Sequence, residues 1–264
     1  MIEVMNKKIR SSLVAATAVL VMSAFPLLAS ASGGGGFMQQ ANNDVADVAS
    51  LQRGARNFMN YCSGCHSAKY IRFNKLQEDL QLTEQQVVEN LMFAARKTDE
   101  LMTVAMPAAD AGRWFGQAPP DLTLVARSRG TDWIYTFLKS FYLDDATATG
   151  TNNLMLPNAS MPAVLWELQG LQTATFSDST SADGSVVSHF ADPAHFESFE
   201  TATPGAMSHE EFDLFVRDLV NFLDWAGTPE QLERRRLGIW VILFLFIFLL
   251  FAYLLKVEIW KDIK

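Results

Sequence analysis

One short stretch of the sequence, Cys62-Ser63-Gly64-Cys65-His66, combines two thiols and an imidazole at a spacing that could do chemistry. The pattern Cys-x-x-Cys-His is the attachment signal for c-type haem. The two thiols add across the haem vinyl groups, and the adjacent histidine is held beneath the iron as an axial ligand. The sequence therefore predicts one haem c, covalently bound at Cys62 and Cys65, with His66 on the iron.

Other uses of this motif fit the sequence less well. The chain has 2 cysteines, and both lie in the motif, whereas a structural zinc site would need two further ligands. A thioredoxin-type pair of Cys62 and Cys65 is the main alternative. Thiol oxidoreductases of that type have a βαβ pattern around the motif, and here the pattern is helical.

Haem iron in electron carriers takes a methionine or a histidine as its sixth ligand. The candidates downstream of the motif are Met92, Met102, Met106, Met155, Met161, Met207, His189, His195 and His209. A methionine held in a loop by a following proline suits this role, and both Met106-Pro107 and Met161-Pro162 have the pattern. The residues alone therefore leave the sixth ligand open.

Composition and charge exclude several classes of protein. The chain has 264 residues, of which 49% are hydrophobic, and a formal net charge of -8. It is too apolar for a disordered chain, and its acidic balance excludes a nucleic-acid binder, which would need a basic stripe.

A long acidic stretch occupies the second half of the chain. From Ser140 to Val216 there are 11 acidic residues and no lysine or arginine. This stretch is either a solvated surface or an electrostatic guide for a basic electron acceptor. The candidates for the guide are Asp144, Asp145, Glu167, Asp178 and Asp183.

The N-terminal residues have the pattern of an export signal. Lys7, Lys8 and Arg10 precede an apolar run over residues 13–28, and Ala29-Ser30-Ala31 supplies the small residues of a cleavage site. We expect residues 1–31 to be a signal peptide that is cleaved, with an uncleaved anchor as the alternative. Export agrees with covalent haem attachment, which takes place outside the bacterial cytoplasm.

The segment Leu237–Leu255 contains 19 residues without a charge. As a helix it is about 28 Å long, close to the ~30 Å hydrocarbon core of a membrane. We expect residues 229–264 to form a membrane anchor with its span at about 237–255, beginning at Thr228 as the N-cap. The signal peptide implies a periplasmic domain and a cytoplasmic C-terminus, so Arg234-Arg235-Arg236 would contact lipid headgroups or a partner.

The residues between the two ends predict a mainly helical domain over 32–228. Apolar residues recur at helical spacing from about Asp47 to Cys65. Capping boxes at Thr83 and Ser208 open two further helices, and another follows Asp132.

Small polar residues dominate the segment 172–204, which we expect to consist of long loops. Asp183-Gly184 is typical of a hairpin turn, with Val186 and Val187 as strand residues. Such loops need something besides contacts within the chain to order them, and a large apolar cofactor would serve.

Several motifs occur in an order that resembles a known family. They are Arg53-Gly54 before the haem motif, the block from Trp114 to Leu122, Arg127-Ser128-Arg129-Gly130, Asn152-Asn153, Met161-Pro162 and the C-terminal anchor. Together they resemble the cytochrome c1 family, the haem subunits of ubiquinol–cytochrome c reductase, in its proteobacterial form. The resemblance implies a class I-like cytochrome c haem domain with long loop insertions and one C-terminal transmembrane helix.

The resemblance also implies roles for individual residues. Met161 rather than Met106 would be the sixth iron ligand, and Pro119-Pro120 would pack beside the haem. Arg129, or else Arg127, would face a haem propionate. The chain lacks the second cysteine pair of many family members, so no disulfide supports the loop that carries the methionine ligand.

The function implied by the resemblance is electron transfer in the bacterial inner membrane. The chain would accept one electron from the Rieske iron–sulfur protein, beside the cytochrome b subunit, and pass it to a soluble or tethered c-type cytochrome. The proton-translocating quinol–cytochrome c oxidoreductase activity would belong to the complex, and this chain would have no catalytic residue. The alternatives are another membrane-anchored monohaem carrier, such as an oxidase subunit, and an anchored thiol–disulfide oxidoreductase.

Overall fold

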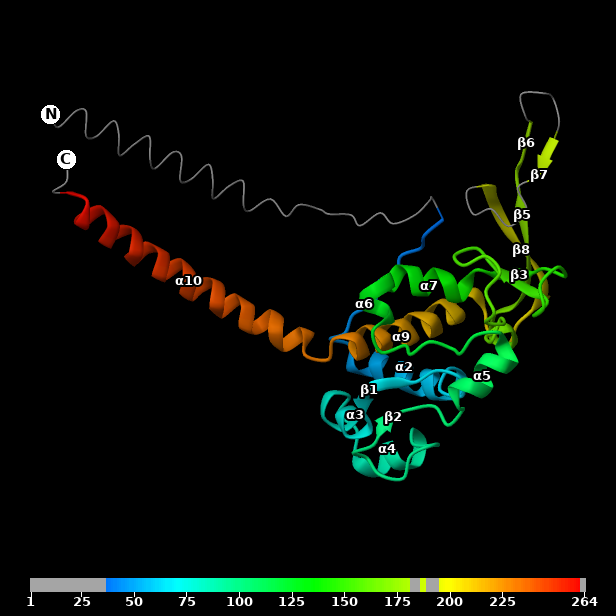
Figure 1. Cartoon of the computed structure of the whole chain (residues 1–264), viewed down its shortest axis with the longest axis horizontal. Helices are drawn as coiled ribbons and strands as arrows, with labels where there is room; N and C mark the ends of the chain where they lie inside the picture. Colours follow the sequence, from blue (N-terminus) through cyan, green and yellow to red (C-terminus); the bar gives the residue numbers. More distant parts are fainter. Residues whose placement is uncertain (1–36, 181–185, 189–194, 262–264) are drawn as a thin grey trace. The chain divides into compact units, whose positions relative to one another are not determined.

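The computed structural model describes residues 37–180, 186–188 and 195–261 (Figure 1). The expected signal peptide over 1–31, its cleavage site at Ala31, the turn at Asp183-Gly184 and the candidate ligand His189 lie outside the described residues and stay predictions. The described elements are helices and short two-stranded antiparallel sheets.

Two helices, α2 (Val48–Tyr61) and α9 (His209–Gly227), cross at the centre of the domain. Gly54 lies at the crossing, where an added Cβ would come 2.0 Å from the carbonyl oxygen of Asp218. Beside it, Arg53 Nε lies 2.5 Å from Asp218 Oδ2. The Arg53-Gly54 pair thus joins α2 to α9, because glycine permits the close backbone approach and arginine pairs with the buried Asp218 carboxylate.

Side-chain caps begin three of the helices where the sequence predicts them. Asp47 caps α2, Thr83 caps α4 (Glu84–Asn90) and Ser208 caps α9, each by accepting a bond from a backbone N–H of the first turn. Helix α2 ends at Tyr61, so the expectation of a helix as far as the second cysteine is wrong. The chain turns at the haem motif instead, as described below.

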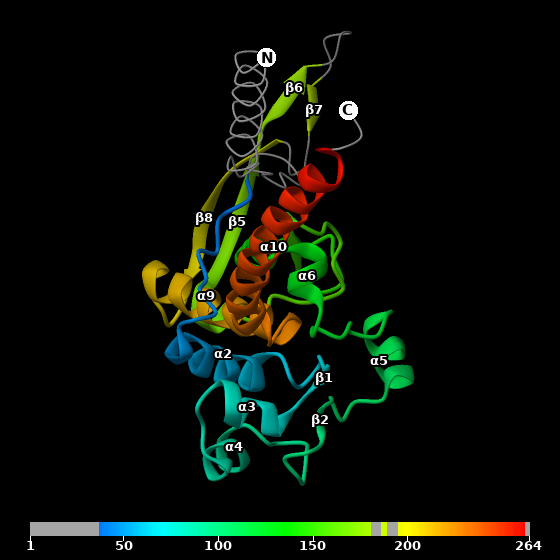
Figure 2. The ribbon, with the colours of Figure 1, turned by 90° about the vertical axis from the view of Figure 1, so that its left-hand side faces the viewer.

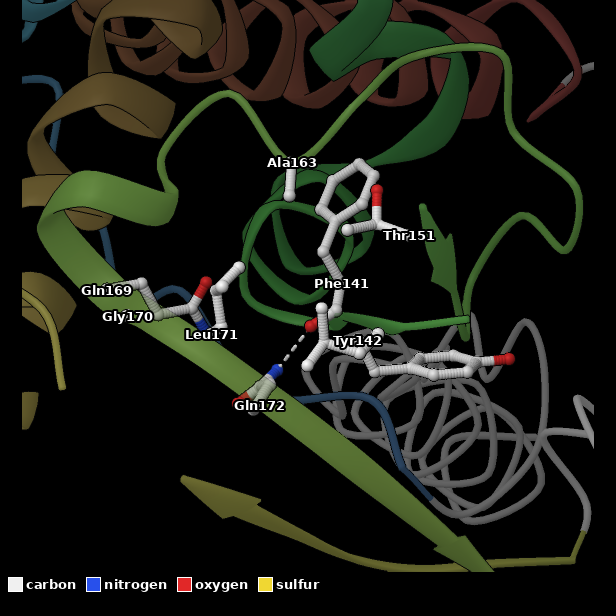
Figure 3. A pocket seen from close by; sticks show the side chains of 9 residues that line it. Phe141, Tyr142, Thr151, Ala163, Gln169, Gly170, Leu171 and Gln172 are labelled. Atoms are coloured by element: carbon white, nitrogen blue, oxygen red, sulfur yellow. Dashed lines mark hydrogen bonds between the residues drawn. The ribbon is translucent and has the colours of Figure 1, made fainter. Parts of the chain in front are cut away.

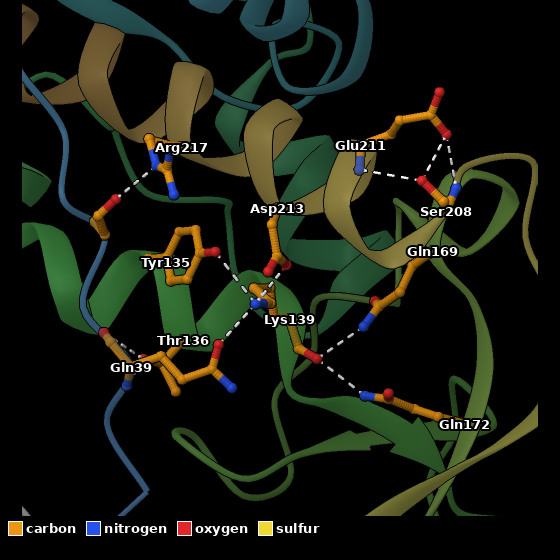
Figure 4. A network of polar contacts seen from close by, with 11 residues as sticks. Gln39, Tyr135, Thr136, Lys139, Gln169, Gln172, Ser208, Glu211, Asp213 and Arg217 are labelled. Atoms are coloured by element: carbon orange, nitrogen blue, oxygen red, sulfur yellow. Dashed lines mark hydrogen bonds and ion pairs between the residues drawn. The ribbon is translucent and has the colours of Figure 1, made fainter.

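The shorter helices include the one expected after Asp132, which begins at Thr131. These helices are α3 (Phe73–Asp79), α5 (Ala108–Phe115), α6 (Val125–Arg129), α7 (Thr131–Lys139) and α8 (Trp166–Gln169). Helices α6 and α7 pack against α9. Lys139 Nζ reaches Asp213 Oδ1 of α9 at 2.5 Å and Gln39 Oε1 at 2.7 Å, which ties the first described residues to both helices (Figure 4).

Antiparallel strand pairs occur between the helices. The pairs are β1 (Ala68–Arg72) with β2 (Leu101–Met102), β3 (Phe141–Leu143) with β4 (Thr151–Asn153), β5 (Gly170–Phe176) with β8 (Phe196–Pro204), and β6 (Asp178–Thr180) with β7 (Val186–Ser188). Figure 2 shows the β5–β8 hairpin leading away from α9, with β6 and β7 at its far end. The expected strand residues Val186 and Val187 are confirmed.

The expectation of loops throughout 172–204 is wrong for β5 and β8. These strands pair over most of their length, with Thr173 opposite Glu200. Gln172 Nε2 also donates to the carbonyl oxygen of Phe141 at 2.7 Å, which joins β5 to β3 (Figure 3). The pairing partners lie far apart in the sequence, so local composition does not reveal them.

Helix α10 (Gln231–Ile259) has 29 residues and, within the described part of the chain, the length and apolarity of a membrane span. It contains the whole of the expected span over 237–255. The expected N-cap at Thr228 is wrong, because the backbone N–H of Thr228 still bonds to α9 and Glu230 occupies the N-cap position without a side-chain cap. The Glu230 carboxylate instead lies 3.1 Å from Lys75 Nζ of α3.

Candidate functional site

The haem motif forms a tight turn directly after α2. The carbonyl oxygen of Cys62 accepts bonds from the backbone N–H of Cys65 at 3.0 Å and of His66 at 2.8 Å. Cys62 is buried at 8% exposure, whereas Cys65 is exposed. One turn therefore carries both thiols and the imidazole, as attachment to a single haem edge requires.

The ring of His66 is oriented by a segment far along the chain. Its Nδ1 lies 2.7 Å from the carbonyl oxygen of Pro120. A carbonyl oxygen can only accept, so Nδ1 carries the proton and Nε2 keeps its lone pair. This is the usual arrangement for a metal-binding histidine, whose second nitrogen donates to a carbonyl or carboxylate. The donor set thus fits an iron porphyrin.

The segment that supplies this carbonyl is bonded to the residues after the motif. The Asp121 side chain accepts from the backbone N–H of Lys69 at 2.8 Å and of Thr123 at 3.1 Å. The backbone N–H of Leu122 donates to the carbonyl oxygen of Ser67 at 2.8 Å. Pro120 is therefore held beside His66 by bonds on its C-terminal side, and half-buried Pro119 precedes it.

The two titratable groups of the turn are shifted mainly by burial. Burial, with a smaller effect of Cys65, raises the pKa of the Cys62 thiol to about 12. This is opposite to the lowered pKa of reactive thiols in thiol–disulfide oxidoreductases. Burial also lowers the pKa of His66, against the smaller effects of the Pro120 carbonyl and Asp121, so the imidazole is neutral and able to bind a metal at neutral pH.

A small open hollow adjoins His66. Its lining is mostly apolar and consists of Phe58, Met59, Ser63, His66, Phe73, Phe93, Ala94, Met102 and Thr103. Phe93, which belongs to this lining, is 64% exposed, and Trp114, further along the chain, is 63% exposed. These exposed rings fit a site for a large apolar group, since burying them would be favourable.

The structure separates the methionine candidates. Met102 is buried and lies in the hollow beside His66. Met161 is half-buried and packs against the core from the loop that follows β4, as do Met155 and, from the segment before α9, Met207. Met106 is half-buried before α5. The side chain that the hollow brings to His66 is thus Met102, and the ligand role of Met161 stays a prediction.

The two arginine candidates lie at α6. The Arg129 guanidinium lies over the ring of Trp133, 5.0 Å from its centroid. The exposed Arg127 lies against Gly227 at the C-terminal end of α9, with its Cγ 3.2 Å from the position of an added Cβ on that glycine. Which of them would face a propionate stays a prediction. The sequence analysis did not identify Asp121 and Ser67 as the residues that hold Pro120 in place. The position of Asp121, directly after the two prolines, could have indicated its role.

The chain matches the model of the Cytochrome C1 family over residues 37–263. Cytochrome c1 of Allochromatium vinosum is 48% identical over 248 residues, which cover 92% of this chain and 98% of that protein. The ammonia monooxygenase gamma subunit of Nitrosomonas europaea is 42% identical over 238 residues, covering 90% of this chain and 94% of that protein. Cytochrome c1 of Rhodospirillum rubrum is 28% identical over 246 residues, covering 83% of each chain.

Proposed function

The chain belongs to the cytochrome c1 family, and from this membership we propose that it takes one electron from a Rieske iron–sulfur protein and passes it to a c-type cytochrome. It is an electron-transfer protein with one covalently bound haem c and a membrane anchor. Proteins of this family work within the cytochrome bc1 complex, so the cytochrome b subunit is the further partner that we assign.

The bond between His66 Nδ1 and the Pro120 carbonyl oxygen carries this proposal, because it leaves Nε2 available for iron beside two thiols. When bound, the haem supplies a one-electron redox centre. The thiols of Cys62 and Cys65 would hold the group through two thioethers. In each, the S–H bond would add across one vinyl group, with sulfur bound to one vinyl carbon and hydrogen to the other. The chain thus attaches the group and orients its ligand, and it needs no general acid or base.

We assign the second axial position to Met161. A histidine and a methionine together raise the reduction potential of a haem in cytochromes c. Pro119 and Pro120 would line the haem edge. Arg129 or Arg127 would form an ion pair with a haem propionate, because the propionate is negatively charged. These assignments rest on the family's motif order and on the position of Pro120 at His66.

The alternative functions have less support. The family match covers nearly all of the described chain, which favours a cytochrome c1 over another anchored monohaem carrier. The raised pKa of Cys62 does not suit a thiol–disulfide oxidoreductase. One relative is named as a subunit of ammonia monooxygenase, and no observation on the described residues favours that role for this chain.

We further propose a topology in the bacterial inner membrane. Residues 1–31 would be removed as a signal peptide, the haem domain over 32–228 would lie in the periplasm, and residues 229–264 would anchor it with the C-terminus in the cytoplasm. The exposed apolar side chains along α10 support a span there, since in water they would be costly to leave uncovered.

Deletion of residues 237–264 is expected to release a soluble haem protein into the periplasmic fraction, because within the described part of the chain one helix, α10, is long and apolar enough to span a membrane. Cell fractionation with haem staining measures this, and the full-length chain, retained in the membrane fraction, is the control. If the shortened chain stays in the membrane, the N-terminal segment is an uncleaved anchor and the proposed topology is wrong.

The electron acceptor is proposed to be basic, and the structure revises the candidate contacts. Asp144 is 6% exposed and accepts a bond from Asn152, so it does not belong to a docking surface. Asp145 and Glu167 are exposed. Asp183 lies outside the described residues.

With ubiquinol as donor, the complex containing this chain is expected to reduce a basic cytochrome c at a rate that falls at least severalfold as salt rises to ~0.15 M. Attraction between opposite charges speeds encounter, and salt at that concentration shortens the Debye length to about 8 Å. Stopped-flow absorbance measures the rate, with an acidic cytochrome c as the control. No ubiquinol-dependent reduction would contradict the proposed function, whereas a salt-independent rate would contradict the acidic docking surface alone.

A further inference from the structure

Two adjacent asparagines at the end of β4 are among the most deeply buried polar residues of the chain. Asn152 is 2% exposed and Asn153 is 0% exposed. Asparagine is rarely buried, and a buried amide must find hydrogen-bond partners because an unsatisfied one is costly. Their bonds therefore indicate what these two side chains hold in place.

Asn152 joins the loop after β4 to the turn before it. Its Oδ1 accepts from the backbone N–H of Asn158 at 2.8 Å, and its Nδ2 donates to Asp144 Oδ2 at 2.8 Å. Asp144 is itself buried, and its Oδ1 accepts from the backbone N–H of Ala146 at 3.0 Å. Asn158 has a φ of 60°, which lies in the left-handed region of backbone conformation.

Asn153 joins the same loop to the end of α7. Its Oδ1 accepts from the backbone N–H of Met155 at 2.8 Å and of Leu156 at 3.2 Å. Its Nδ2 donates to the carbonyl oxygen of Phe137 at 2.8 Å. The two amides of β4 thus fasten three backbone N–H groups of one loop to Asp144, in the turn after β3, and to α7.

The loop fastened in this way runs directly to Met161-Pro162. Both cysteines of the chain belong to the haem motif, so no disulfide can brace this loop. We propose that Asn152 and Asn153, with Asp144, are positioning residues that keep the Met161 thioether at the iron. This inference rests on the proposed function, in which Met161 is the sixth ligand.

Replacement of Asn152 by leucine tests the proposal in the membrane complex that carries haem. Leucine has a similar volume but cannot make the bonds of the amide with Asp144 and with the backbone N–H groups of Asn153 and Asn158. The methionine should therefore dissociate from the iron more readily. We expect a weaker far-red charge-transfer band of the oxidised haem. We also expect the Kd for added imidazole, which competes with the thioether, to fall roughly tenfold, as loss of a buried hydrogen bond would produce.

An exchange of the pair separates positioning from loss of folding. Asn152→Asp alone would place two carboxylates together and should weaken the band. In the double variant Asp144→Asn/Asn152→Asp, the amide at 144 can donate to the carboxylate at 152, which still accepts from the loop. The band and the imidazole Kd should then return toward those of the wild type. Equal defects in the single and double variants would overturn the proposal.

Asn221→Leu is the matched control, since Asn221 is 0% exposed and its Nδ2 donates to Asp44 O at 2.7 Å and Ser50 Oγ at 3.0 Å, at the α2–α9 crossing. It should lower the melting temperature without changing imidazole binding. If Asn152→Leu behaves in the same way, the role of Asn152 is merely structural and the proposal is wrong. The Met161→Leu variant reports separately on the proposed ligand, because a band that survives in it contradicts the ligand assignment itself.

Discussion

We expect the double variant Cys62→Ser/Cys65→Ser to give no haem-stained band on a denaturing gel, whereas the wild-type chain gives one. Serine keeps the size of the side chain but does not add to a vinyl group. The two thiols lie on one turn, closed by bonds from the backbone N–H of Cys65 and His66 to the Cys62 carbonyl. Peroxidase staining of the gel and a pyridine haemochrome spectrum measure the loss.

Single variants and a neighbouring residue supply the controls. Cys62→Ser and Cys65→Ser should each keep one thioether, and the haemochrome band should move to longer wavelength because one vinyl group stays unsaturated. Ser63→Ala should retain both thioethers, since the Ser63 hydroxyl only donates to the Met59 carbonyl oxygen at 2.7 Å. A stained band in the double variant, or a colourless wild-type chain from cells that mature c-type cytochromes, would contradict the assignment.

Sequence reasoning succeeded where the determining contacts are local. The capping boxes at Thr83 and Ser208 involve residues within one helical turn, and both begin helices as expected. The helix expected from about Asp47 also begins there. The cap expected at Thr228 failed because the preceding helix still uses that backbone N–H. A local pattern therefore predicts a helix start well only when no neighbouring element competes for the same group.

The parts that the sequence did not reveal depend on contacts between distant residues. The β5–β8 hairpin joins segments whose composition resembles loops. At the site, the sequence revealed the haem motif itself. It did not reveal the hydrogen bond between His66 and Pro120, because the two residues are 54 positions apart. The resemblance placed Pro120 beside the haem without saying that its carbonyl orients the imidazole. It likewise gave no role to Asn152 and Asn153, which prove to be buried hydrogen-bonding residues.

Replacing Met161 by leucine is expected to abolish the far-red charge-transfer band and to lower the reduction potential. The decrease should be roughly 100 mV or more, within the ~0.8 V range that axial ligands span. The reason is that a thioether opposite a histidine favours Fe(II) and raises the potential in cytochromes c. Leucine nearly conserves the volume of a half-buried side chain, so packing should change little. Absorbance spectra of the oxidised complex and a redox titration measure both effects.

Met102→Leu and Met106→Leu are the controls, and Met102 is the stronger competitor because it lies with His66 in the same hollow. If Met102→Leu abolishes the band and Met161→Leu does not, the ligand assignment is wrong. The strand pairing argues against that outcome. Met102 pairs with Ala68, shortly after His66 in the chain, so it is held on the histidine's own segment. We would expect the second iron ligand to come from a segment other than the one paired with the residues after His66, and Met161, in the loop after β4, meets this condition.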